Sequence, residues 1–116
     1  MFLDQISTFD EIAERVCIYR DAQQDAGLPA DPADIALTRP LLLARDNRDR
    51  EALIDSHLAT LAQLSDSARC AARNPFHSDE DSRRQRAEDS AIVGDPAECR
   101  ERIAHVAALG VSQVLF

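Results

Sequence analysis

One segment constrains the fold of this chain more than any other feature of the sequence. Residues 35–44 read IALTRPLLLA, with Ile35, Leu37, Leu41 and Leu43 on one alternating face and Ala36, Thr38, Leu42 and Ala44 on the other. Because both faces are largely apolar, the pattern predicts a strand that is covered on both sides, as in a parallel sheet. Pro40 cannot donate a ladder hydrogen bond, so we expect a bulge or a strand end near it.

Arg39 interrupts this apolar run and is the best single candidate for a site residue. A buried guanidinium must find a carboxylate, a phosphate or backbone carbonyl groups as partners. One interpretation is therefore that Arg39 binds a cofactor. The other is that it is a strand-end arginine paired with an acidic side chain such as Asp46.

A helical pattern precedes the strand. Ser7 and Thr8 precede Asp10 and Glu11 with capping-box spacing, and apolar residues then recur at helical intervals. The pattern predicts an amphipathic helix over residues 8–26.

Two further segments complete the N-terminal half. Residues 28–34 carry two prolines and are predicted to be a connecting loop. After the strand, Asp46 or Asn47 can cap a second helix, and an apolar stripe continues it over about residues 47–64.

Residues 65–90 lose the apolar periodicity and are dense in charge, so we expect a solvated insertion or a mobile loop. It contains the carboxylates Asp79, Glu80 and Asp81 and the arginines Arg83, Arg84 and Arg86. The carboxylates are interpreted as a solvated charge run, because a flexible loop does not fix the geometry of a metal or acid–base site. The alternative for the arginines is a lid over an anionic cofactor, although nearby acids offset their field.

The C-terminal segment has the clearest capping pattern. Asp95 is a natural N-cap, Pro96 suits the first helical position, and Glu98 completes a capping box. Gly110 is predicted to end this helix in the left-handed conformation, and residues 111–116, VSQVLF, are predicted to be a strand. The alternation of helices and strands indicates an α/β fold with parallel strands.

The start of this last helix also has a binding interpretation. Free N–H groups after Gly94 can hold a phosphate, but Asp95 would compete for those donors and repel an anion. Capping is therefore the preferred interpretation. We also expect Glu98 to pair with Arg102 at the favourable four-residue spacing.

Composition excludes several functions. The chain has 116 residues, 21 acidic and 13 basic, and a net charge of −8, so it is at most one domain and disfavours nonspecific nucleic-acid binding. Its longest apolar stretch, from Pro40 to Ala44, is far too short to span a membrane. Because the start of the chain is acidic and lacks a secretory pattern, a cytoplasmic location is the default expectation.

The cysteines and histidines indicate no metal site. The three cysteines and three histidines are widely spaced, whereas zinc needs close pairs. Cys17 and Cys99 fall on apolar helix stripes, so we expect both thiols to pack in the core.

The ordered combination of these elements resembles a known family. The segment AIVGDPAECRERIAHVAALGVSQVLF, residues 91–116, resembles the closing part of luciferase-like, flavin-dependent monooxygenases. The helix IAERVCIYRDAQQDAG followed by IALTRPLLLARD looks like the preceding helix and strand of that family. Members fold as (β/α)₈ barrels of about 250 residues. The resemblance therefore implies that residues 1–116 are a single C-terminal segment, with the last two barrel strands and their helices.

The resemblance also implies a function. The complete protein would use FMN or a deazaflavin on a small organic substrate, whereas this chain alone is expected to be inactive and to bind no flavin tightly. No position matches a catalytic motif of the family, so no catalytic residue is transferred. Partners would be the missing barrel half or a second copy. The alternative is a small acidic helical interaction module without catalytic activity.

Overall fold

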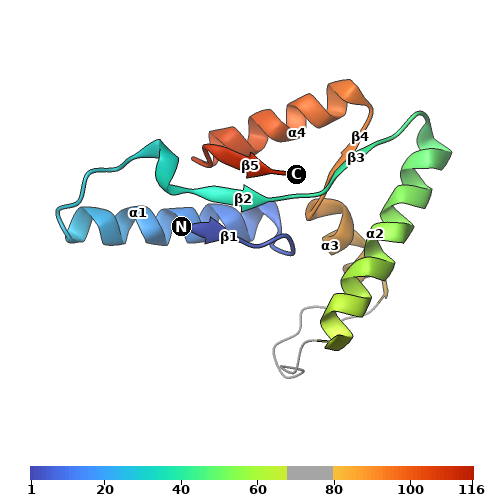
Figure 1. The fold of residues 1–116 in the computed structure, drawn as a ribbon, viewed down its shortest axis with the longest axis horizontal. Coiled ribbons are helices and arrows are strands. Elements are labelled where there is room, and N and C mark those ends of the chain that lie inside the picture. The colour runs from blue at the N-terminus through green and yellow to red at the C-terminus, as the bar shows by residue number, and fades with distance from the viewer. Residues whose placement is uncertain (68–79) are drawn as a thin grey trace.

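The computed structural model describes residues 1–67 and 80–116, in which helices alternate with short strands (Figure 1). In chain order the elements are β1 (Phe2–Leu3), α1 (Phe9–Asp25), a 3₁₀ turn (Pro32–Asp34), β2 (Ala36–Thr38), β3 (Leu41–Leu43), α2 (Asn47–Ser67), α3 (Glu80–Asp89), β4 (Ile92–Gly94), α4 (Pro96–Ala108) and β5 (Gln113–Leu115). Among these helices, none combines the length and the apolar content that crossing a bilayer requires.

Within the described residues, the strands form two small sheets in which every strand pair is parallel. One sheet has the order β1-β2-β5, and its register places Leu3, Leu37 and Val114 side by side. The other sheet pairs β3 with β4, so Leu43 lies opposite Gly94. The predicted α/β fold with parallel strands is confirmed. The two-residue strand β1 was not predicted, because it is too short to show an alternating pattern.

The segment 35–44 departs from the single strand that its pattern predicts. It forms β2 and β3, which belong to different sheets. Arg39 N donates to Leu115 O at 3.0 Å, whereas Pro40 O accepts from Ile92 N at 2.9 Å. The pairing partner therefore changes from β5 to β4 at the proline, whose missing N–H ends the first strand as expected.

The change of partner also alters which side chains are covered. Ile35 and Leu37 are fully buried, but Leu41 and Leu43 are 38% and 55% exposed. In β3 it is Leu42 that packs inward, against the cluster that α2 and β4 form. The predicted coverage of both faces is therefore wrong for β3, because the alternation shifts by one residue at the proline.

The helix starts agree with the predicted capping. Thr8 Oγ1 accepts from Glu11 N at 3.3 Å and Glu11 Oε2 accepts from Thr8 N at 2.8 Å, which is the expected capping box of α1. Asp46 Oδ1 accepts from Asp49 N at 2.8 Å at the start of α2. After α4, Gly110 has a φ of +89°, which is the predicted left-handed conformation.

Both predicted loops contain helical structure. The loop over residues 28–34 includes the 3₁₀ turn. The loop predicted over 65–90 is wrong at both ends, because α2 continues to Ser67 and α3 follows from Glu80. Residues 68–79, which include Asp79, lie outside the described residues. The pattern missed α3 because this helix has a single apolar residue, Ala87, and hence no apolar stripe.

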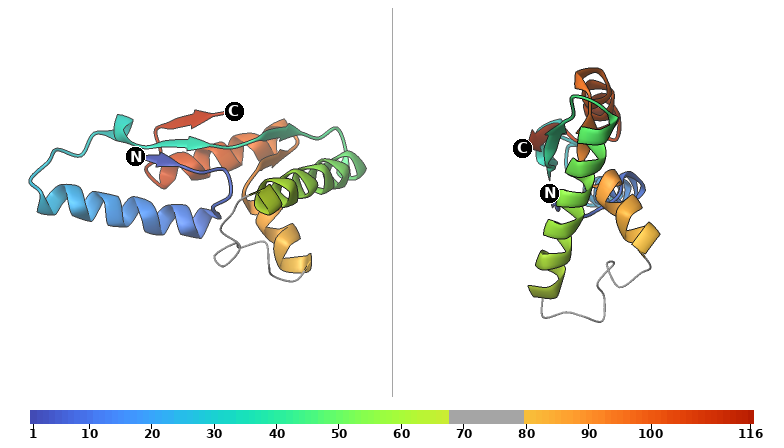
Figure 2. Two further views of the ribbon diagram at one scale, coloured as in Figure 1. Left: turned by 60° about the horizontal axis from the view of Figure 1, so that its bottom comes forward. Right: turned by 90° about the vertical axis from the view of Figure 1, so that its right-hand side faces the viewer.

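The main core lies between the three-stranded sheet and the helices α1 and α4, which pack on the same face of it (Figure 2). Its buried members are Leu3, Ile12, Val16, Ile35, Leu37, Val106 and Val111. Side chains of adjacent strand residues point to opposite faces. The neighbours of the inward residues, Phe2 and Leu115, are 65% and 50% exposed. The sheet is thus covered by helices on one face and exposes apolar side chains on the other.

Candidate functional site

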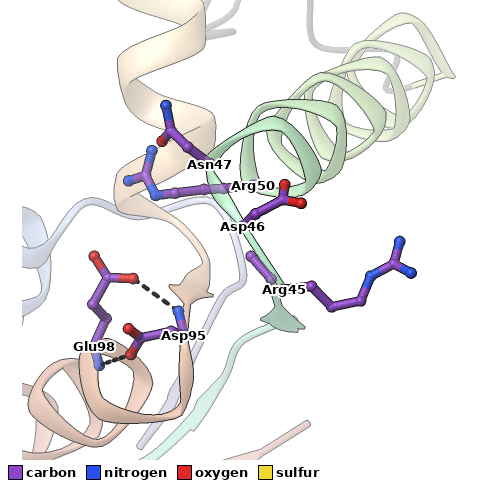
Figure 3. Close-up of a pocket in the computed structure, with 7 residues that line it drawn as sticks. Arg45, Asp46, Asn47, Arg50, Asp95 and Glu98 are labelled. Atoms are coloured by element: carbon purple, nitrogen blue, oxygen red, sulfur yellow. Dashed lines mark hydrogen bonds between the residues drawn. The ribbon is translucent and has the colours of Figure 1, made fainter.

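A hollow of about 250 Å³ lies where the carboxyl ends of β3 and β4 meet (Figure 3). The parallel pairing of these strands brings together the starts of α2 and α4, each of which follows its strand after a short turn. The residues that line the hollow are Ala44, Arg45, Asp46, Asn47, Arg50, Asp95 and Glu98. In parallel α/β folds, ligands bind at this edge of the sheet, so the hollow is the candidate site.

On the α4 side, the first-turn N–H groups are already bonded. Asp95 Oδ1 accepts from Ala97 N at 2.7 Å and from Glu98 N at 2.9 Å. Glu98 Oε2 accepts from Asp95 N at 2.8 Å, which closes the predicted capping box (Figure 3). The capping interpretation is confirmed, and these donors are not directed at a ligand.

On the α2 side, Arg45 leans away from the hollow (Figure 3). Its Nε donates to Asp49 Oδ2 at 3.0 Å, and its side chain is 87% exposed. This hydrogen bond lowers the pKa of Asp49 to about 2. Arg45, which lies just before α2, is therefore paired with Asp49 on the outer surface of that helix.

Arg50 is the second cation of the hollow, and it too is paired. It forms ion pairs with Glu88 of α3 and, at 3.4 Å, with Glu51. The hydrogen bond to Glu88 raises the pKa of Arg50. Arg50 was not singled out from the sequence, although a basic residue in the first turn of a helix that follows a strand could have indicated it.

The donor set of the hollow does not fit the phosphate of a flavin nucleotide. Phosphate sites combine free helix N–H groups with unpaired cations. Here Asp46, Asp95 and Glu98 line the hollow, both arginines have acidic partners, and the capping carboxylates hold first-turn N–H groups. The described residues thus place carboxylates where an anion would have to bind.

Arg39 lies apart from the hollow and is fully buried. Its Nη1 donates to Asp4 O at 3.2 Å and its Nη2 donates to Ser7 O, in the turn between β1 and α1. Its Nε has no partner among the described residues. Burial lowers the pKa of Arg39 to about 10. A buried arginine was expected to find a carboxylate, a phosphate or backbone carbonyls, and in the structure its partners are backbone carbonyls. The interpretation that Arg39 pairs with an acidic side chain such as Asp46 is wrong.

Two arginines of α3 are engaged in ion pairs. Arg86 forms a two-pronged pair with Glu11 of α1, at 2.8 Å for its shortest distance, and Arg84 pairs with Glu51 and Asp55 of α2. Since these guanidinium groups hold helices together, the lid interpretation has no support from their geometry.

The two cysteines within the described residues divide between core and surface. Cys99 is buried as predicted, and its burial raises the pKa of its thiol. Cys17 is exposed, so its predicted place in the core is wrong. In the part of the chain that the structure describes, no three His, Cys, Asp or Glu side chains gather in a way that could hold a metal ion.

Comparison with known proteins places the chain in a family. The family model of the luciferase-like monooxygenases matches residues 1–113. The crystal structure of monooxygenase RslO1 from Streptomyces bottropensis is similar in fold, with a TM-score of 0.57 and 21% sequence identity. That match covers 97% of this chain and 32% of that chain, so this chain spans about a third of the solved protein. No curated protein matches the chain in sequence. On the match of the family model, the chain belongs to the luciferase-like monooxygenase family.

Proposed function

We propose that this chain is the C-terminal part of a flavin-dependent, luciferase-like monooxygenase, and that it supplies the last strands and helices of a (β/α)₈ barrel. In this proposal the complete protein uses FMN or a deazaflavin on a small organic substrate, and the chain alone is inactive. The observation that carries the proposal is the three-stranded sheet, which is covered by helices on one face and uncovered on the other.

The two faces match the two environments of a barrel strand. Leu3 and Leu37 face α1 and α4, as barrel strands face the outer ring of helices. The apolar side chains of Phe2 and Leu115 point the other way and are 65% and 50% exposed. In a closed barrel, inward side chains from other strands fill the interior on that side. The rest of the barrel would supply this cover.

The hollow at the carboxyl ends of β3 and β4 would form one sector of the active-site edge. Barrel enzymes build their sites from several strand ends, and this chain holds only part of the set. Because carboxylates line the hollow and both of its arginines are paired with acidic side chains, the cofactor would be held mainly by residues outside this chain. No step of the reaction is assigned to the residues of the hollow.

The same exposed face is also what an acidic interaction module without catalysis would present. Such a module would cover Phe2 and Leu115 with an unrelated partner. The family match over residues 1–113 favours the barrel, because it includes the strands β1 to β4 together with the helices.

A chimaeric protein tests the proposal. In it, this chain replaces the C-terminal part of a luciferase-like barrel that binds flavin. Flavin absorbance and fluorescence quenching would report binding. The chimaeric protein should bind FMN, and Leu115→Lys on the interior face should abolish binding. Glu101→Lys, on the exposed surface of α4, is the matched control and should retain it. Equal FMN binding by both variants would contradict the proposed placement of this sheet.

A further inference from the structure

The helix α3 is attached to the rest of the fold by charge. Within its ten residues, EDSRRQRAED, Ala87 is the one apolar side chain and the one buried residue. It touches a small cluster formed with Leu61, against which Ile6 and Leu58 pack. An alanine side chain brings little apolar area of its own, so α3 itself supplies few apolar contacts to this packing.

The ion pairs of α3 reach three other helices. Arg86 binds both carboxylate oxygens of Glu11 on α1, with distances of 2.8 to 3.1 Å. Glu88 accepts from Arg50 on α2 and lies 3.6 Å from Arg102 Nη2 on α4. The sequence pattern predicted a different partner for Arg102, namely Glu98, whose carboxylate is instead bonded within the capping box.

The remaining pairs of α3 join it to the outer surface of α2. Arg84 binds Glu51 and Asp55, whose side chains are 49% and 65% exposed. The side chains of the Arg86 and Glu11 pair are 22% and 37% exposed. Solvent and counterions therefore reach the Arg84 pairs directly and the Arg86 pair in part. The Debye length falls from about 10 Å at 0.1 M salt to about 3 Å at 1 M, so added salt weakens them.

The neighbouring helices are held differently. On α1, Ile12 and Val16 enter the main core, and Val106 of α4 is fully buried in it. Screening of charge leaves such apolar contacts intact, because burial of apolar area does not depend on Coulomb attraction. Raised ionic strength is therefore expected to weaken the attachment of α3 more than that of α1 and α4.

We propose that α3 is an ionic strap that detaches from α1, α2 and α4 when the ionic strength rises, while the sheet and the other helices remain folded. Its release uncovers the apolar cluster of Ile6, Leu58 and Leu61. The salt concentration would thereby set the fraction of molecules in which α3 is detached.

Amide hydrogen exchange of the full chain, at about 0.05 M and about 1 M sodium chloride, tests the strap. We expect the amides of α3 to exchange about three- to tenfold faster at high salt, with those of α4 nearly unchanged. Exchange of α3 that is the same at both salt concentrations would overturn the proposal. So would equal acceleration in α3 and α4, because it would mean that the whole fold opens.

Variants separate the ion pairs from general effects of salt. Arg86→Gln should accelerate exchange in α3 at low salt and reduce its response to salt, whereas Arg86→Lys keeps the charge and should retain most of the response. Arg45→Gln is the matched control, since it removes an exposed ion pair, with Asp49 of α2, in which α3 takes no part. Equal exchange of α3 in the Arg86→Gln and Arg45→Gln variants would contradict the proposal.

Discussion

The cap of α4 allows the most quantitative prediction. Asp95→Ala removes the oxygen that accepts from Ala97 N and Glu98 N, at 2.7 and 2.9 Å. Loss of an N-cap side chain costs about 0.5 to 2 kcal/mol. Because two N–H groups lose one acceptor together, we expect the upper part of that range, about 1 to 2 kcal/mol. With an unfolding entropy of about 2.1 cal/mol/K per residue, Tm should fall by about 4 to 8 °C for 116 residues.

Thermal and urea denaturation, followed by circular dichroism at fixed protein concentration, measure this loss. Asp95→Asn keeps the acceptor and removes only the charge, so it should cost less than half as much as the alanine variant. Glu101→Ala, on the exposed surface of the same helix, should change the free energy of unfolding by less than about 0.5 kcal/mol. Unfolding midpoints of Asp95→Ala and Glu101→Ala that coincide would refute the role of this cap.

Three further predictions follow from the geometry. Leu115→Lys, on the exposed side of an edge strand, should reduce any concentration-dependent association of the isolated chain in light scattering, with little change in its melting temperature. Gly94→Ala should lower Tm, because Gly94 has a φ of +141° and an added Cβ would lie 2.7 Å from Glu98 Cβ; an unchanged Tm would argue against this turn. Burial alone would raise the pKa of Asp4, but hydrogen bonds from Arg15 and backbone N–H groups lower it from 3.8 to about 2. Its contribution to stability is present above pH 3.8 and is lost as the pH falls toward 2, so Asp4→Asn should flatten the acid unfolding curve over that interval.

The features that were predictable from the sequence are those set by neighbours along the chain. Thr8 with Glu11 and Asp95 with Glu98 form their capping boxes within three residues, so the spacing alone locates two helix starts. The apolar run 35–44 predicted parallel strands because both of its faces lack charge except at Arg39.

The features that were missed depend on residues far apart in the sequence. Arg86 and Glu11 are 75 positions apart, and no periodicity reports a helix that is held by such a pair. The hollow exists because Leu43 pairs with Gly94, which lies far from it in the sequence. The backbone carbonyls that accept from Arg39 belong to residues more than 30 positions before it. Local patterns carry no information about which distant segments will meet.

A titration of the isolated chain with FMN tests the central claim most directly, because the claim is that this chain carries one part of a flavin-binding barrel. Quenching of FMN fluorescence measures the binding. Because the hollow presents carboxylates and bonded N–H groups to an anion, we predict no saturable binding at micromolar concentrations of FMN. A dissociation constant in the micromolar range or below would show that the chain holds a flavin site by itself, and would contradict the account.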